Sequence, residues 1–256
     1  MSDEIVIFEI NDGVAEVTLN RPEVHNAFDA VMIARLSEIW DALAANDDVY
    51  AVVLNGKGKS FSAGADLNWM KEAANFTKEQ NFDDAMKLAT MLHKLYTLPQ
   101  ITIATVYGAA MGGGMGLVSC CDVVIVDMAA KFALSEVKLG LIPATIAPYV
   151  IRAIGERQAK RFFQTGERFD GKKAYEIGLA HELAERPEDV EYLVHRVLKE
   201  AAQNGTHAMR QSKKLCLDVA GTPLSEALMN DTADRIAEIR TGLEAQKRLA
   251  SFLEKR

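Results

Sequence analysis

Two loops rich in small residues follow two strongly apolar stretches of the chain. Ala63-Gly64-Ala65 comes after residues 50–54, and Gly112-Gly113-Gly114 comes after residues 101–106. Small residues let a ligand approach the backbone closely, and the N-terminus of a helix offers N–H groups that have no partner. Two such loops facing each other could direct two N–H groups at one carbonyl oxygen, which is the arrangement of an oxyanion hole. The same glycines would also allow a helix to pack tightly on a strand, and spacing alone leaves both interpretations open.

The carboxylate best suited to acid–base chemistry in this sequence is Glu136. It stands between two apolar stretches, residues 132–134 and 139–141. Burial in such surroundings would raise its pKa towards the range that suits proton transfer at neutral pH. The competing interpretation is a surface glutamate in a loop, paired with Lys138.

Two glycine-containing segments resemble nucleotide-binding motifs, but neither fits the full motif. Gly58-Lys59-Ser60 resembles the end of a phosphate-binding loop, but that motif needs a glycine five residues before Gly58, where the chain has Val53. Residues 112–116 follow a strand and precede a helix, yet they do not fit the G-x-G-x-x-G spacing of a dinucleotide-binding turn. We therefore expect neither a nucleoside triphosphate nor a dinucleotide as ligand.

Metal and thiol chemistry are equally unsupported by the sequence. The 5 His residues are scattered and show no metal-ligand spacing, so we expect no metal site. Of the 3 Cys residues, Cys120 and Cys121 are adjacent and lie in an apolar stretch. We interpret them as packing residues rather than as nucleophiles or members of a disulfide framework.

Strands and helices that would position these groups alternate along much of the chain. Residues 5–10 and 14–19 alternate in polarity around Asn11-Asp12-Gly13, which predicts a β-hairpin. Asp29 is a candidate N-cap for the amphipathic helix that follows it. Residues 108–116 are expected to form a loop that opens a helix. Buried strands are predicted at residues 50–54, 101–106 and 122–127, and helices at residues 78–96, 188–203, 208–220 and 224–254. This alternation indicates stacked βα units followed by a helical C-terminal region.

Composition and charge exclude several classes of function. The chain has 256 residues, of which 49% are hydrophobic, and a formal net charge of −7. This acidic balance argues against a nucleic-acid partner, because phosphate binding needs a basic surface. No apolar run reaches membrane-spanning length, and residues 1–4 lack the basic and apolar character of a signal peptide. We therefore expect no membrane partner and a cytoplasmic location.

Four segments of the sequence resemble, in order, the signature segments of the enoyl-CoA hydratase (crotonase) family. They are residues 20–27, 61–67, 108–116 and 132–143. The resemblance extends over nearly the whole chain, from residue 5 to residue 255. The stretch of residues 140–149 is also similar to the methylglutaconyl-CoA hydratase branch of leucine breakdown.

The resemblance implies an α/β fold, a crotonase-like spiral of stacked ββα units with a helical C-terminal trimerisation region. It divides the chain into a core at residues 1–195 and a helical region at residues 196–256, and it implies a homotrimer or a dimer of trimers. The partner would be an acyl-CoA thioester, with coenzyme A as part of the substrate and no separate cofactor. The backbone N–H groups of Ala65 and Gly113 would hold the thioester oxygen, and Glu136 would be the catalytic carboxylate.

The same resemblance assigns further residues to the binding of the CoA substrate, two of them in a tail that would contact the CoA of a neighbouring subunit. The full set is Glu23, Val24, Ala27, Ala63, Gly64, Ala65, Asp66, Leu67, Gly112, Gly113, Gly116, Phe252 and Lys255. For Asp66, the sequence alone favours a cap or charge–dipole role at the start of a helix. Trp69 and Met70 could line the acyl pocket or belong to the core.

The sequence departs from the family pattern at Gly116. Well-studied hydratases of the family hold one water between two glutamates, and the first of these falls at this position, where glycine cannot exchange protons. We predict a lyase that hydrates a 2-enoyl-CoA, with 3-methylglutaconyl-CoA as the favoured substrate. Either Glu136 serves both proton transfers, or a carboxylate of the substrate helps to hold the water. On the second hypothesis, Gly116→Glu changes substrate choice.

Three alternatives stay open from the sequence. A single carboxylate at Glu136 could move a proton between two carbons, which would make the protein an enoyl-CoA isomerase. Decarboxylation of a glutaconyl-type thioester would use the same enolate. A non-catalytic acyl-CoA-binding scaffold is the third alternative, and a buried Glu136 would count against it.

Overall fold

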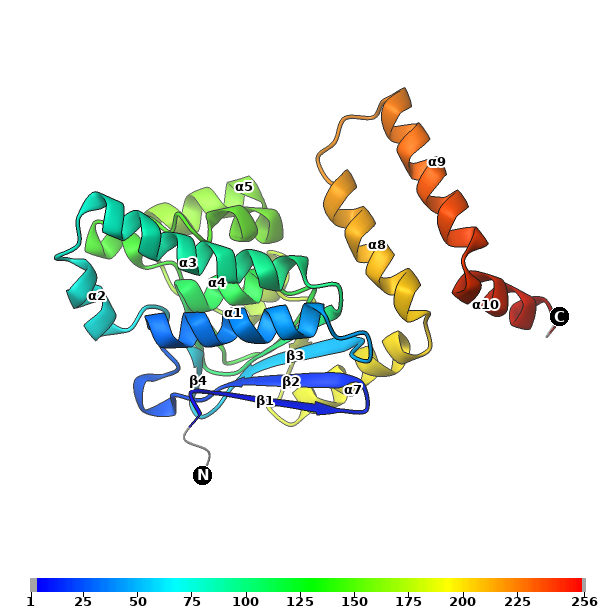
Figure 1. Cartoon of the computed structure of the whole chain (residues 1–256). Helices are drawn as coiled ribbons and strands as arrows, with labels where there is room; N and C mark the ends of the chain where they lie inside the picture. The colour runs from blue at the N-terminus through cyan, green and yellow to red at the C-terminus, as the bar shows by residue number, and fades with distance from the viewer. Residues whose placement is uncertain (1–3, 255–256) are drawn as a thin grey trace.

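The structure of the protein, a computed structural model, describes residues 4–254 and contains two β-sheets surrounded by helices (Figure 1). The first sheet consists, in spatial order, of β1 (Val6–Asn11), β2 (Val14–Leu19), β3 (Ala51–Gly56), β5 (Ile101–Val106), β7 (Val123–Asp127) and β10 (Glu182–Ala184). The second sheet consists of β4 (Ser60–Ser62), β6 (Ala109–Met111), β8 (Lys131–Ala133) and β9 (Phe169–Asp170).

The first two strands form the predicted hairpin. β1 and β2 pair antiparallel, with Val6 opposite Leu19. The turn residues Asp12 and Gly13 have positive φ angles of 48° and 76°, as a tight two-residue hairpin turn requires. From β2 to β10, the neighbouring strands of this sheet pair in parallel. A parallel sheet with helices on its faces confirms the α/β class.

Three consecutive units of the chain each place one strand in the first sheet, one strand in the second sheet and then helical structure. β3 and β4 lead into α2 (Leu67–Ala73) and α3 (Lys78–Thr97). β5 and β6 lead into α4 (Gly113–Cys120), and β7 and β8 lead into α5 (Ala147–Thr165). This arrangement is the spiral of stacked ββα units that the sequence resemblance implies.

The sequence pattern predicts a loop at residues 108–116, and here the structure differs. Ala109–Met111 forms β6, which pairs with β4 on one side and β8 on the other, and α4 begins at Gly113. A three-residue strand of mostly small residues carries almost no alternation of polarity. Its pairing is therefore imposed by the neighbouring strands rather than by local preference.

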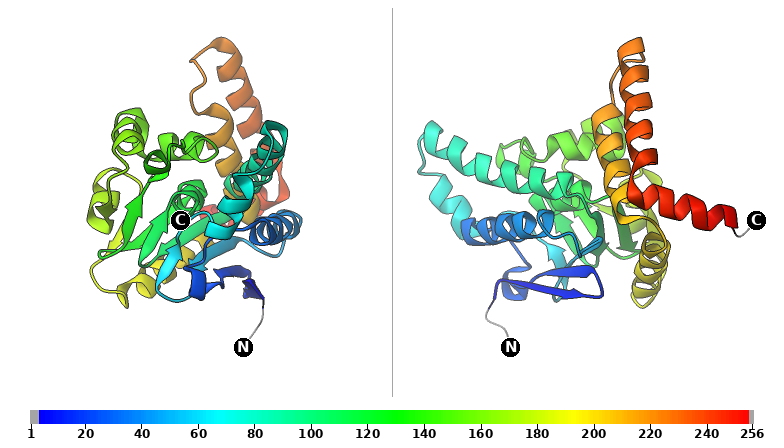
Figure 2. Two further views of the ribbon diagram at one scale, coloured as in Figure 1. Left: turned by 90° about the vertical axis from the view of Figure 1, so that its left-hand side faces the viewer. Right: turned by 45° about the vertical axis from the view of Figure 1, so that its right-hand side comes forward.

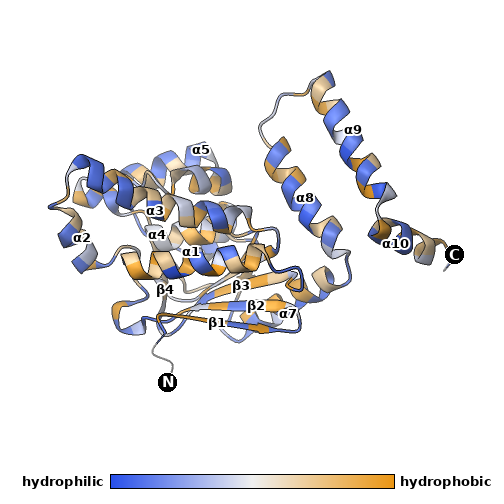
Figure 3. Cartoon of the chain, viewed as in Figure 1, coloured by the Kyte–Doolittle hydropathy of each residue, from blue (hydrophilic) through white to orange (hydrophobic). Residues whose placement is uncertain are grey.

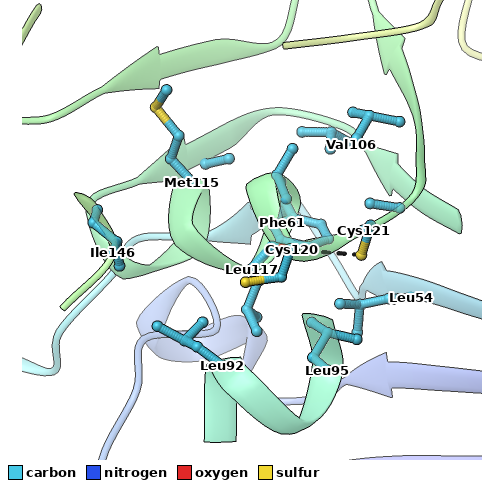
Figure 4. Packing of buried hydrophobic residues seen from close by; sticks show 14 of the residues in the cluster. Leu54, Phe61, Leu92, Leu95, Val106, Met115, Leu117, Cys120, Cys121 and Ile146 are labelled. Carbon is cyan, nitrogen blue, oxygen red and sulfur yellow. Dashed lines mark hydrogen bonds between the residues drawn. The ribbon is translucent and has the colours of Figure 1, made fainter. Parts of the chain in front are cut away.

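The core is built around helices that cover the first sheet. α1 (Ala30–Ala44) begins at Asp29, whose side chain accepts the backbone N–H of Met32 at 2.8 Å, which confirms the predicted N-cap. α1 packs on α3, and α3 packs in turn on α4. Figure 4 shows Leu92 of α3 and Leu117 of α4 within this buried cluster. The helix that begins at the glycine-rich loop, α4, is therefore fixed in position by its packing against the main core.

The C-terminal part of the described chain is helical. It contains α6 (Gly171–Glu176), α7 (Asp189–Ala202), α8 (Thr206–Val219), α9 (Glu226–Thr241) and α10 (Leu243–Glu254). The last three helices extend away from the sheets as an arm (Figures 1 and 2). The expected boundary between residues 195 and 196 falls inside α7. This helix packs on the first sheet both before the boundary, through Leu193, and after it, through Val197. The division into two regions stays a prediction.

Apolar residues are interspersed with hydrophilic ones along α9 and α10, the outer helices of the arm (Figure 3). Met229 and Ile236 on α9 are exposed, as are Leu243 and Phe252 on α10. These helices remain amphipathic. Between residues 4 and 254, no helix has both the length and the apolar content needed to cross a membrane.

Candidate active site

Three segments of the chain meet where the parallel strands β4, β6 and β8 end. Ala63 follows β4, Gly112 follows β6, and Leu134 follows β8. The carboxyl ends of parallel strands lie at one edge of a sheet, and β6 is the central strand of the three. The two small-residue loops and the segment that carries Glu136 are therefore neighbours, although they are far apart in sequence.

The orientation of Ala65 is set by an isolated parallel bridge to Phe28. The N–H of Phe28 donates to the carbonyl of Gly64, and the carbonyl of Phe28 accepts the N–H of Asp66, both at 2.7 Å. In a parallel bridge, one residue bonds to the two neighbours of its partner, so the partner's own N–H points to the opposite side. The N–H of Ala65 consequently faces away from Phe28.

The loop that begins α4 runs on that opposite side. Gly64 has a φ of +88°, and a Cβ built on it would lie 2.8 Å from the carbonyl oxygen of Met111 and 3.5 Å from the nitrogen of Gly113. Position 64 therefore requires glycine, both for its backbone conformation and for the close approach of the two loops. Gly113 is the first residue of α4, where N–H groups have no carbonyl four residues earlier in the helix. Across residues 4–254, no backbone acceptor is found for the N–H of Ala65 or Gly113.

The side chain of Glu136 lies against the same loop. The N–H of Gly112 donates to the carbonyl of Ala133 at 2.9 Å, which ties the end of β6 to the end of β8. A Cβ built on Gly112 would lie 3.0 Å from Oε1 of Glu136, so the absence of a side chain at 112 makes room for this carboxylate. Within the described chain, Glu136 forms no ion pair with Lys138 or any other cation. The pairing with Lys138 that the competing interpretation requires is therefore absent, and Glu136 is partly buried.

The electrostatic state of Glu136 is unusual for a carboxylate. Its Oε2 is buried and has no hydrogen-bond partner among the described residues. Burial raises its pKa above the ordinary value, and its own backbone N–H offsets this only in part. A carboxyl group with a raised pKa is suited to both accepting and returning a proton near neutral pH.

A cavity of about 410 Å³ lies over these groups. Of the predicted site residues, it is lined by Ala63, Gly64, Ala65, Leu67, Gly112, Gly113 and Glu136. Trp69 and Met70 of α2 also line it, and Trp69 packs against the main core as well. The cavity therefore brings the two candidate N–H donors and the carboxylate into one space.

Among the described residues, six that were predicted to bind substrate lie outside the lining of this cavity. Glu23 and Val24 are exposed in a short 3-10 helix, and the carbonyl of Ala27 accepts Nη1 of Arg21 at 2.8 Å. Gly116 is buried behind Ile146. Phe252 lies on α10, on the opposite side of the molecule from α2 (Figure 1). Asp66 is buried at the start of α2. Lys255 lies outside the described residues.

Asp66 has a structural role at the start of α2. Its side chain accepts the backbone N–H of Asn68 at 2.8 Å, which confirms the capping interpretation, and it pairs with Arg21 at 3.1 Å. Desolvation raises the pKa of Asp66, but the N–H groups of Asn68 and Trp69 and the charge of Arg21 outweigh it, so the net pKa is lowered. The cap at Asn68 and the ion pair with Arg21 therefore fix the residue that follows Ala65.

Nearly the whole sequence matches the model of a known family. The family model described as enoyl-CoA hydratase/isomerase matches residues 9–256. The chain belongs to this family. It is similar to the crystal structure of an enoyl-CoA hydratase from Shewanella pealeana, with 40% identity, a TM-score of 0.95, and coverage of 99% of this chain and 94% of that one.

Two further solved structures extend this similarity. Pseudomonas aeruginosa AtuE is 34% identical, with a TM-score of 0.95 and coverage of 99% and 98% of the two chains. An enoyl-CoA hydratase/isomerase from Marinobacter aquaeolei is 32% identical, with a TM-score of 0.93 and coverage of 98% and 97%. The crotonase-like fold expected from the sequence is therefore shared by structures of the enoyl-CoA hydratase/isomerase family.

Sequence reasoning missed most of the apolar wall of this enoyl-CoA hydratase/isomerase cavity. The loop between Glu136 and α5 contributes Leu139, Leu141, Ile142, Pro143, Thr145 and Ile146 to the lining. Leu139 and Ile142 are exposed despite being apolar. A run of apolar residues in a loop without helical or strand periodicity was the available signal. α3 adds Asp84 and Leu88, which nothing in the sequence distinguishes from other residues of that helix.

A larger cavity of about 870 Å³ lies between the core and α8 and is lined in part by Cys121, Asp122 and Lys213. Asp122 is paired with Lys213 at 2.7 Å, and burial raises the pKa of Cys121 to about 12. The Cys121 thiol is therefore not set up to exchange protons near neutral pH. In the part of the chain that the structure describes, no group of three or more His, Cys, Asp or Glu side chains is placed to hold a metal ion.

Proposed function

We propose that this member of the enoyl-CoA hydratase/isomerase family adds water to the double bond of a 2-enoyl-CoA. The N–H groups of Ala65 and Gly113 hold the thioester oxygen. Glu136 takes a proton from water as the water oxygen bonds to C3, and the electron pair of the double bond moves to form a thioester enolate. Glu136 then returns the proton to C2. One water has been added, and the carboxylate regains its initial charge.

The observation that carries this proposal is the carboxylate of Glu136 in the cavity of the two N–H groups, because its Oε2 is buried and has no hydrogen-bond partner among the described residues. A buried carboxylate oxygen without a hydrogen bond costs stability, and groups of this kind concentrate at functional sites. The N–H groups supply what the enolate needs, since each donor of an oxyanion hole is worth about 3–4 kcal/mol in the transition state. A scaffold that only binds acyl-CoA would have no use for such a carboxylate.

For the acyl group, we propose 3-methylglutaconyl-CoA as the favoured substrate. The stretch of residues 140–149 carries the resemblance to the methylglutaconyl-CoA hydratase branch, and five residues of this stretch line the cavity. The charged side chains of the lining are Glu136 and Asp84, both acidic. Because acidic side chains repel a carboxylate on the substrate, a thioester with a neutral acyl group is the main alternative to 3-methylglutaconyl-CoA.

The charge at Asp84 separates these two acyl groups experimentally. Asp84→Asn removes an acidic side chain from the cavity wall, so it is expected to raise kcat/KM for 3-methylglutaconyl-CoA more than for crotonyl-CoA. Asp83→Asn is the matched control, because Asp83 neighbours Asp84 on α3 and does not line this cavity. An equal effect of Asp84→Asn on both substrates would place the acyl carboxylate away from this wall.

A second candidate function is isomerisation of an enoyl-CoA double bond. It is favoured by Gly116, which provides no side chain to hold a water together with Glu136. In that reaction Glu136 removes a proton from C2 of a 3-enoyl-CoA and returns it to C4, with the same enolate between the two steps. No water enters the product.

The assembly is the third part of this proposal. We propose that the exposed apolar residues of α9 and α10 join the subunits of a homotrimer or a dimer of trimers in the cytoplasm. In that assembly, Phe252 and Lys255 reach the CoA of a neighbouring subunit. Coenzyme A enters as part of the substrate, and the reaction needs no separate cofactor.

One assay separates the candidate functions. The protein is incubated in turn with crotonyl-CoA, a 3-enoyl-CoA and 3-methylglutaconyl-CoA, and the absorbance of the conjugated thioester is followed. Loss of absorbance with the conjugated substrates indicates hydration, a gain with the 3-enoyl substrate indicates isomerisation, and no change with all three supports a scaffold.

The role of Glu136 is tested in the same assay. Glu136→Gln is expected to lower turnover by about 100-fold or more, because it removes the group that exchanges protons. Glu176→Gln, an exposed glutamate of α6, is the control and should retain wild-type turnover. Wild-type turnover in Glu136→Gln would refute the mechanism.

A further inference from the structure

Gly116 has no room for a side chain. It is buried in α4, and a Cβ built on it would overlap with Cγ2 of Ile146 and would lie 3.0 Å from Cβ of Ile146. Leu92 of α3 closes the space further, with Cδ2 at 3.9 Å from the same point. Even an alanine at position 116 would therefore require Ile146 to move.

Ile146 is not free to move. It is 2% exposed, and it is the residue before α5, where its carbonyl accepts the N–H groups of Tyr149 and Val150, both at 3.1 Å. Its β-branched side chain has few accessible rotamers. Figure 4 shows Ile146 beside α4, with Leu92 nearby in the same cluster. Backbone and side chain together hold its Cγ2 in front of Gly116.

The same side chain forms part of the cavity wall together with Glu136. Gly116 lies one helical turn after Gly112, to whose carbonyl its N–H donates at 3.1 Å, and the open side of Gly112 faces the carboxylate of Glu136. A side chain at position 116 would point at Ile146, which lines the cavity of Glu136, whereas Gly116 itself does not. Ile146 therefore occupies the space through which a longer side chain at position 116 would approach the cavity.

We propose that Ile146 is a specificity-determining residue. It restricts position 116 to glycine, replaces a second carboxylate with an apolar wall, and selects acyl groups that carry an alkyl branch on C3. This inference rests on the hydration proposed above. It also changes the expectation for Gly116→Glu, which must disrupt packing unless Ile146 is shortened in the same protein.

The contact is tested by thermal unfolding, without any assumption about activity. Gly116→Ala is introduced into the wild type, into Ile146→Val and into Ile146→Ala. Valine keeps a methyl group at the position of Cγ2, whereas alanine removes it. We expect Gly116→Ala to lower Tm by several degrees in the first two proteins and by clearly less in the third. An equal loss in all three proteins would overturn the proposed contact.

Selectivity is tested with crotonyl-CoA as the straight substrate and 3-methylcrotonyl-CoA as the branched one. We expect the wild type to prefer the branched thioester, and Ile146→Ala to reduce that preference about 10-fold, with a smaller change in Ile146→Val. Equal changes in kcat/KM for both thioesters would contradict a role in selectivity.

Failure of the proposed hydration gives a different result. If the wild type turns over neither these two thioesters nor 3-methylglutaconyl-CoA, hydration is refuted. The preference is then taken from the dissociation constants of crotonyl-CoA and 3-methylcrotonyl-CoA, measured by titration calorimetry. A branched-to-straight preference that Ile146→Ala abolishes would then still support the role of Ile146. The same ratio of the two dissociation constants in wild type and in Ile146→Ala would refute the role of Ile146.

Discussion

The ring of Phe28 lies directly against Gly113: a Cβ built on this glycine would be 2.8 Å from Cε2 of the ring. The backbone of the same phenylalanine bonds to both neighbours of Ala65. Phe28 is fully buried and bulky. One residue therefore braces both loops whose N–H groups we assign to the thioester oxygen, so a displacement of either loop is expected to disturb the pair.

Gly64→Ala is expected to impair catalysis far more than stability. The variant forces alanine into a φ of +88° and brings its Cβ to 2.8 Å from the carbonyl of Met111, so the loop of Ala65 has to shift. Misplacement of one oxyanion donor should lower kcat/KM by about 100-fold or more. The measurement is steady-state kinetics with the substrate identified by the assay above.

The control for this variant is Gly178→Ala, because Gly178 does not line the cavity of Glu136. Gly178 has a φ of +83°, and its nearest neighbour to a built Cβ is the carbonyl of Ala153 at 3.5 Å. Gly178→Ala should lose about 1–2 kcal/mol of stability from the unfavourable backbone conformation, which is comparable to the loss in Gly64→Ala. Its kcat/KM should stay within a few-fold of wild type. Comparable loss of activity in both variants would show that the loop geometry at Gly64 has no special role.

Arg21→Met should lower stability at neutral pH by about 1–3 kcal/mol. Arg21 is 16% exposed at its side chain and pairs with Asp29 at 2.8 Å and Asp66 at 3.1 Å. Because the pKa of Asp66 is lowered in the folded state, the stability it contributes is present above its ordinary value of 3.8 and is lost as the pH falls through the folded value. The stability difference between Arg21→Met and wild type should therefore shrink on acidification.

Urea unfolding at neutral pH and near pH 3 measures this difference. Arg35→Met is the control, since Arg35 forms an exposed pair with Glu38 and should change stability by less than about 0.5 kcal/mol at either pH. A destabilisation of Arg21→Met that is equally large at both pH values would argue for lost packing rather than for the ion pairs.

Glu136→Gln should stabilise the protein at neutral pH relative to wild type. The pKa of Glu136 is raised above 4.5 in the folded state, so the folded protein favours the protonated form and loses stability as the pH rises through that pKa. Glutamine carries no charge and avoids this loss. The Tm of the variant minus that of wild type should be near zero at pH 4 and positive at pH 7. A constant difference across this range would mean that the carboxylate ionises without penalty.

Much of the fold follows from local patterns in the sequence. The alternation in residues 5–19 and the turn at Asp12 and Gly13 predict the hairpin, and Asp29 predicts the start of α1. The helix predicted at residues 224–254 is divided in the structure at Gly242, between α9 and α10, because glycine is a weak point in a helix. The second sheet is different. Its strands have two or three residues each, too few to show a period, and they exist because the longer strands of the first sheet bring them together.

The site could be predicted only in part for the same reason. The adjacency of the segments at Ala65, Gly113 and Glu136 depends on the order of β4, β6 and β8, and spacing in the sequence does not reveal it. The family resemblance supplied that information. It could not supply the contact between Gly116 and Ile146, because this contact depends on how the start of α5 packs on α4.

Lys213→Met should loosen the attachment of the C-terminal arm. Nζ of Lys213 on α8 donates to Asp122 at 2.7 Å and to the carbonyl of Gln100 at 3.1 Å, and its side chain is only 11% exposed. Because the same oxygen of Asp122 also accepts the N–H of Thr102 at 2.8 Å, this cation links α8 to the end of the first sheet. Its loss should cost about 1–3 kcal/mol and increase amide hydrogen exchange in α8.

The neighbouring Lys214 provides the control for this variant. It pairs with Asp218 one turn further along α8 and is exposed, so Lys214→Met should change stability by less than about 0.5 kcal/mol. Since both substitutions remove one positive charge from the same helix, any difference between them reports the buried link rather than the net charge. Equal protection of α8 in both variants would show that other contacts, such as that of Arg210 with the carbonyl of Val49 at 3.1 Å, suffice to hold the arm.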